Sequence, residues 1–164
     1  MIDPVVLANQ QELAQLTTWL IGLPGIKEAG YVAGINHAET KAKTLLWAGE
    51  STMHDIIRAE ANRRGITLTI RSVRYSLAQL DTAASRLWAC VDRPEWNGFR
   101  ISYIAGTNAT RDGLSVGGAY ETPSERADAA RLTDTLAFAQ SIAPEVVEVE
   151  IGSVVPLGHR PDQG

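Results

Sequence analysis

The residues most suggestive of catalysis lie at positions 113–117, where the letters GLSVG fit the G-x-S-x-G pattern of a nucleophile elbow. In an α/β-hydrolase, Ser115 would attack an acyl group and a histidine would take its proton. The partners, in the chain order of that fold, would be Asp128 or Asp134, followed by His159. This set makes a serine hydrolase one candidate activity.

The elements around Ser115 favour a different interpretation. An elbow needs a strand before the serine and a helix directly after it. Residues 114–119 instead have the pattern of one continuous strand, and the next helix begins only after Thr122. Glycines inside a strand are typical of a bulge or of close packing. We therefore favour a protein without catalytic activity and keep Ser115 as the one catalytic candidate.

A metal or redox centre is not expected. The histidines His37, His54 and His159 include no His-x-x-x-His pair. Cys90 is the only cysteine, so the chain can form neither a cysteine ligand pair nor an internal disulfide. The sequence therefore predicts no metal and no cofactor.

The composition is that of a globular protein. The 164 residues are 45% hydrophobic and 21% charged, which suits one domain or two small packed modules. A formal net charge of -4 argues against nucleic acid as a partner, and no apolar run is long enough to cross a membrane. The start, MIDPVVLANQ, lacks the features of a signal peptide, which favours the cytoplasm; removal of a leader would place the protein outside the cell.

Hydrophobic periodicity predicts helix, strand, strand, helix and strand in the first half of the chain. The first helix begins at an Asp3 cap followed by Pro4, where the missing N–H of proline costs nothing. The remaining elements are strands at 31–37 and 44–48, a helix from Ser51 or Thr52 to Gly65, and a strand at 66–71.

The second half predicts the same order. Ser76 and Gln79 form a capping box at the start of a helix, which ends before Pro94. The elements that follow are strands at 99–107 and 114–119, a helix after a second capping box at 122–125, and a strand at 147–151.

Two pairs of similar segments indicate a duplicated module. YVAGIN at 31–36 returns as YIAGTN at 103–108, in the first strand of each half. IRSV at 70–73 returns as IGSV at 151–154, in the closing strands. Two such pairs, with the same element order, favour an internal repeat over chance. The predicted divisions are a first αββαβ module at 1–75, a second at 76–154, and a tail at 155–164.

The predicted fold class is α+β, with two tandem α-β-β-α-β repeats. Each repeat would form an antiparallel or mixed sheet of three strands, and helices would pack on one face of it. A sheet of three strands has two edges, and the unpaired amides and carbonyls of an edge can accept another strand. The sheet edge is therefore the expected recognition surface.

Three tryptophans are informative about packing. Trp19 and Trp88 belong to the first helix of each repeat and are expected to pack on its sheet. Trp96 lies in a turn, PEWNG, where its position favours a capping role over the end of the preceding helix. A binding anchor is the alternative for an exposed side chain there.

The segment VRYSLAQLD at 73–81 resembles a phrase in the pro-regions of alpha-lytic-type bacterial serine endopeptidases, the streptogrisin group of actinobacteria. In that family a basic residue, an aromatic residue or histidine, and then Ser-x-x-Glu/Gln-Leu close one strand and start the next helix. Those pro-regions also contain a pair of hairpin-plus-helix modules. The similarity in layout covers residues 28–154.

The resemblance implies a folding chaperone and inhibitor of a trypsin-like serine protease. In such proteins the edge of the last sheet accepts strands from the enzyme, and the tail, here 155–159, lies in the active-site cleft. The resemblance therefore implies the following partner-binding residues: Val147, Val149, Ile151, Val154, Val155, Pro156 and Leu157. No protease sequence follows residue 164, so we expect either a fragment of a longer precursor or a free-standing relative.

Two other functions stay open at the level of sequence. A small ligand-binding protein or hydrolase would use a pocket between the two modules. An assembly or structural subunit would form homo-oligomers through its sheets.

Overall fold

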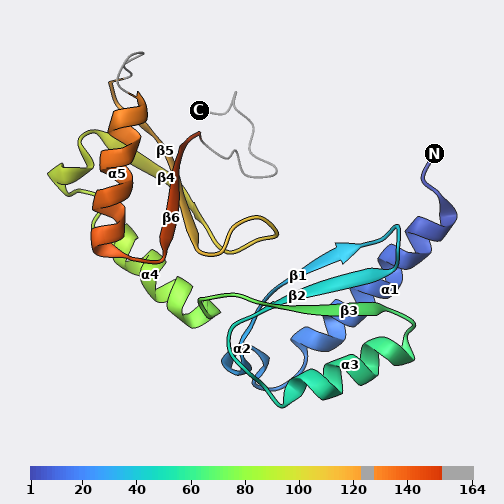
Figure 1. The fold of residues 1–164 in the computed structure, drawn as a ribbon. Helices are drawn as coiled ribbons and strands as arrows, with labels where there is room; N and C mark the ends of the chain where they lie inside the picture. The colour runs from blue at the N-terminus through green and yellow to red at the C-terminus, as the bar shows by residue number, and fades with distance from the viewer. Residues whose placement is uncertain (123–127, 153–164) are drawn as a thin grey trace. The chain divides into compact units, whose positions relative to one another are not determined.

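The computed structural model describes residues 1–122 and 128–152, which form two three-stranded sheets in two compact units (Figure 1). The first unit contains residues 1–80 together with 107–112, and the second contains 81–106 and the residues from Gly113 onward. The chain combines helices with two mixed three-stranded sheets, which confirms the predicted α+β fold class. The module boundary placed near residue 75 stays a prediction.

The first sheet is mixed. Its strand order is β1-β2-β3, with β1 antiparallel to β2 and β3 parallel to β2. The parallel step follows from α3, which carries the chain back between β2 and β3. The elements in chain order are α1 (Pro4–Ile21), α2 (Ile26–Ala29), β1 (Tyr31–His37), β2 (Ala42–Trp47), α3 (Met53–Arg63) and β3 (Thr67–Ser72).

The second sheet repeats this arrangement. Its strand order is β4-β5-β6, again with an antiparallel hairpin and a parallel third strand. Compared with the sequence analysis, only the short α2 and η1 are new, and the strand bounds shift by one or two residues. The elements are α4 (Leu77–Ala89), the 3₁₀ helix η1 (Pro94–Trp96), β4 (Phe99–Ala105), β5 (Leu114–Tyr120), α5 (Asp128–Ile142) and β6 (Val146–Ile151).

Two predicted helix starts are confirmed in atomic detail. The Asp3 carboxylate accepts a hydrogen bond from the Val5 N–H at 2.8 Å. Ser76 Oγ accepts one from the Gln79 N–H at 3.2 Å, and Gln79 Oε1 accepts one from the Ser76 N–H at 2.8 Å. These bonds satisfy amides that a helix start would otherwise leave without a partner. The second predicted capping box, at 122–125, lies mostly outside the described residues.

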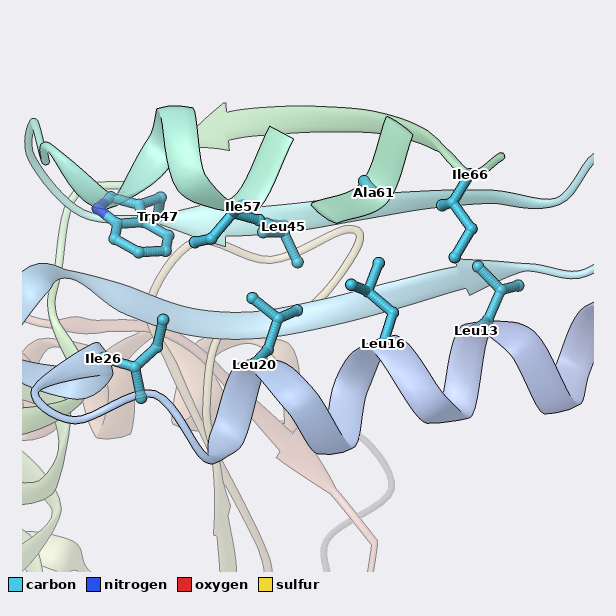
Figure 2. Packing of buried hydrophobic residues seen from close by; sticks show 9 residues of the cluster. All are labelled: Leu13, Leu16, Leu20, Ile26, Leu45, Trp47, Ile57, Ala61 and Ile66. Carbon is cyan, nitrogen blue, oxygen red and sulfur yellow. The ribbon is translucent and has the colours of Figure 1, made fainter. Parts of the chain in front are cut away.

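The first core lies between one face of the β1-β2-β3 sheet and the helices α1 and α3 (Figure 2). Leu13, Leu16 and Leu20 recur along one side of α1 at the spacing of a helical turn, and all are fully buried. They meet Leu45 and Trp47, alternate residues that share one face of β2. Helices from before and after the hairpin therefore cover the same face, as predicted.

The second core is built around aromatic side chains. The Trp96 ring contacts Phe99 and Phe138, with centroids 6.2 and 5.0 Å apart, and Phe99 contacts Tyr120 at 5.2 Å. Trp96 is only 2% exposed, and its indole N–H donates to the Cys90 carbonyl at 2.7 Å, beyond the end of α4. The capping role predicted for Trp96 is confirmed, and the alternative of an exposed anchor is wrong.

The prediction for Trp88 is wrong. Its side chain is 44% exposed, whereas Trp19 is half-buried against the first core as expected. The reason lies in the phase of α4, which buries Ala83 and Leu87. Trp88 follows Leu87 by one residue and is therefore turned about 100° away from the buried stripe.

The two similar hexamers do not occupy equivalent places: YVAGIN lies within β1, whereas YIAGTN starts at Tyr103 in β4 and continues past the end of that strand at Ala105. Tyr31 lies opposite Trp47 and packs against the first core. Tyr103 lies opposite Gly117, whose neighbour Val116 faces the second core, so the Tyr103 side chain lies on the opposite face of its sheet. The duplication is therefore supported by element order and strand pairing rather than by these letters.

Within residues 1–122 and 128–152, no helix combines the length and the apolar character that crossing a bilayer requires.

Candidate functional site

The edge strand β6 carries the first three residues that the sequence analysis assigned to a partner. Among the described strands, β6 pairs only with β5, so its other side is an open sheet edge. Val147 and Val149 are half-buried, and Ile151 is 51% exposed. The other four assigned residues lie outside the described residues, namely Val154, Val155, Pro156 and Leu157.

The main chain of β6 alternates between β5 and the open edge. The Gly152 N–H donates to the Gly118 carbonyl at 2.8 Å, so Gly152 faces β5. In a parallel ladder alternate residues bond the neighbouring strand. Val149 and Ile151 therefore direct their N–H and C=O groups toward the open edge. Val147 lies beside an irregularity in the pairing of β5 with β6 and does not share this regular alternation.

A polar cluster lies beside this edge, on the sheet face opposite the second core. Glu150, in β6, accepts hydrogen bonds from Ser115 Oγ at 3.4 Å and from the Tyr103 hydroxyl. Ser115 is fully buried. The cluster joins all three strands of the sheet, because Tyr103 comes from β4 and Ser115 from β5. It therefore fixes the position of β6 from the side chains as well as from the main chain.

The surroundings of Ser115 do not resemble a hydrolase site. Ser115 is the second residue of β5, which continues to Tyr120 without a following helical turn, as the sequence pattern predicted. Both described histidines, His37 and His54, belong to the first unit, while Ser115 belongs to the second. His159 lies outside the described residues. The hydroxyl donates to a carboxylate, and no described imidazole of its own unit is present to take its proton.

Packing accounts for the glycines of the G-x-S-x-G pattern. A Cβ on Gly117 would lie 2.0 Å from the Tyr103 ring, and one on Gly118 would lie 1.9 Å from the Arg100 carbonyl oxygen. Gly113 has a φ of 138°, a conformation that side chains disfavour. Gly117 therefore allows the Tyr103 side chain to pass over β5 and reach Glu150. The tyrosine–glutamate pair was missed from the sequence, because only the strand register brings these residues together.

A second unusual group lies in the first unit. Lys43 projects from β2 toward α1 and is 1% exposed. Its ammonium donates to Thr17 Oγ1 and to Asn36 Oδ1, both at 2.6 Å. Among the described residues it forms no ion pair. Burial lowers the pKa of Lys43, because a charged amine is poorly solvated inside a protein.

Within the described part of the chain, no group of three or more His, Cys, Asp or Glu side chains is placed to hold a metal ion. No protein-family model, curated protein or solved structure matches the chain.

Proposed function

We propose that this protein is a non-enzymatic binding module that accepts an extended strand of a partner protein along β6. The observation that carries the proposal is the open edge formed by Val149 and Ile151, whose main-chain groups point away from β5. The resemblance of residues 73–81 to serine-protease pro-regions makes this proposal more specific. In that form the partner is an alpha-lytic-type serine protease, and the module acts as its folding chaperone and inhibitor.

The sequence of β6 suits strand addition. Sheet edges are commonly protected against pairing by lysine, proline or bulges within the strand. The letters of β6 are VVEVEI, with no lysine, arginine or proline, and its irregular pairing is confined to the start of the strand, at Val147. Ile151 also offers an exposed apolar side chain at the open edge. Each main-chain hydrogen bond gained by a partner would contribute about 0.5–1.5 kcal/mol, and apolar contacts would add to this.

A single proline tests the edge without breaking the sheet. Proline at position 149 removes an N–H that faces the open edge, so the ladder between β5 and β6 keeps its hydrogen bonds. The matched control is Ile70→Pro in β3. Ile70 is also half-buried and is also the fourth residue of its edge strand. Its N–H points outward, because the Val73 N–H bonds the Trp47 carbonyl and alternate residues of a parallel ladder face the paired strand.

The measurement is inhibition of a mature alpha-lytic-type protease by the purified chain. We expect slow, tight inhibition by the natural sequence, an inhibition constant raised at least about tenfold in Val149→Pro, and little change in Ile70→Pro. Circular dichroism would verify that both variants are folded. Absence of inhibition by the natural sequence would overturn the protease assignment. Equal inhibition by the natural sequence and Val149→Pro would overturn the role of the β6 edge.

A further inference from the structure

A groove of about 460 Å³ lies at the other edge of the second sheet, beside β4. One wall comes from Trp88 near the end of α4 and from Val91 just after it, and the floor contains Phe99 and Ile101 of β4. All the lining residues belong to the second unit. The volume lies within the range of ordinary ligand sites. The groove is separate from the β6 edge, because β5 lies between the two strands.

The wall of the groove is unusually apolar for a surface. Trp88 and Val91 are 44% and 39% exposed, although tryptophan is commonly buried when it lies on a helix that packs on a sheet. The floor of the groove is tightly packed, because Phe99 is 3% exposed and stacks on the buried Trp96. An exposed indole on a rigid aromatic floor has the composition of a binding hot spot.

The floor also carries main-chain groups without a partner strand. The Glu121 N–H donates to the Gly98 carbonyl at 2.9 Å, which places Gly98 among the residues that bond β5. Residues of an antiparallel pair alternate between bonding the neighbour and facing away from it. Phe99 and Ile101 therefore direct N–H and C=O groups to the open side of β4, and no other described strand pairs with them there.

The charged rim does not select a charged ligand. Of its four charged side chains, Arg100 pairs with Glu121, and the opposite charges of Asp92 and Arg93 balance each other. These pairs leave the open main chain and the exposed indole as the main recognition features. A small apolar ligand would cover Trp88 but leave the amides and carbonyls of β4 unpaired, which costs free energy when water is excluded. An extended peptide satisfies both features.

We infer that this groove binds an extended segment of a partner protein, which pairs with β4 and inserts an aromatic or large aliphatic side chain beside Trp88. Phe99 and Ile101 would exchange main-chain hydrogen bonds with the segment. Trp88 and Val91 would cover the inserted side chain. The site would act independently of the β6 edge, so the sheet could be extended on both sides.

The test is selection from a phage-displayed library of random linear peptides against the full chain, followed by fluorescence anisotropy with the selected peptides. We expect the selected peptides to share an aromatic or large aliphatic residue, and Trp88→Ala to weaken their binding at least about tenfold. Two variants serve as controls that keep binding. Ile56→Ala removes another apolar helix residue that is 57% exposed, and Ile70→Pro alters an edge strand of the other sheet.

A second readout separates strand pairing from simple contact with the indole. Hydrogen exchange at the Phe99 and Ile101 amides should slow when a selected peptide binds. The inference would be overturned if no peptide were enriched, if the selected peptides bound Trp88→Ala as well as the natural sequence, or if these two amides stayed unprotected. A natural chain that dimerises, with a monomeric Trp88→Ala variant, would instead assign the groove to a second copy. The two sites are tested with different variants, Trp88→Ala here and Val149→Pro at β6, so a failure here is distinguishable from a failure at β6.

Discussion

At the scale of single residues, Lys43 has the most unusual environment. Its ammonium is buried between β2 and α1 and bonds only the neutral side chains of Thr17 and Asn36 among the described residues. Thr17 also donates to the Leu13 carbonyl, and Asn36 is exposed enough to bond water. Both partners could therefore lose the lysine and keep other hydrogen bonds. The two hydrogen bonds of Lys43 therefore do not fully offset the free energy that burial of its charge costs.

We therefore expect Lys43→Met to raise the free energy of unfolding at neutral pH by about 1 kcal/mol. The folded pKa of Lys43 lies below its ordinary value of 10.5, so the unfolded chain binds the proton more tightly. The natural protein should gain stability as the pH rises toward 10.5, and the advantage of the variant should shrink over the same range. Urea unfolding from pH 7 to 10.5 measures both, with the exposed Lys27→Met as control. A variant less stable than the natural protein would contradict this account.

Gly117 is the residue on which the polar cluster beside β6 depends. A methyl group there would lie 2.0 Å from the Tyr103 ring, so Gly117→Ala should displace the tyrosine from Glu150 and cost about 1–3 kcal/mol. Gly106→Ala is the control, because nothing lies within 4 Å of a Cβ at that position. Denaturant unfolding of both variants measures the difference. Equal stabilities would show that Tyr103 does not need the glycine.

At the scale of elements, most of the fold could be predicted because the signals are local. The Asp3 cap, the Ser76 capping box and the alternating strands depend on neighbouring residues, and the structure confirms them. The phase of α4 could not be predicted with the same accuracy. Ala83 and Ala84 fit the apolar stripe about equally well, and the choice of Ala83 turns Trp88 outward.

The candidate site was only partly predictable, for a related reason. Strand alternation placed Val149 and Ile151 in a closing strand, and the sheet order then makes that strand an edge. The Tyr103–Glu150 contact joins strands β4 and β6, which never pair directly. This contact forms only at one register of β4 and β6 with β5, and that register could not be predicted from the sequence pattern.

At the scale of the whole molecule, the chain uses one arrangement twice. Each sheet has a central strand paired on one side with a hairpin partner and on the other with a parallel strand after a helix. The helix-covered face of each sheet holds its own core, and the unpaired main chain of an edge strand is a surface that can accept another strand. The edge composition differs between the copies: β3 contains Arg71, while β6 contains no basic residue.

The central claim is that β6 accepts a partner strand, and hydrogen exchange tests it most directly. The amide protons of Val149 and Ile151 should exchange quickly in the free protein, because they face the open edge. In a complex with an alpha-lytic-type protease, we predict that both become strongly protected, while the outward amide of Ile70 in β3 is unchanged. A stable complex in which Val149 and Ile151 exchange as fast as in the free protein would contradict the account.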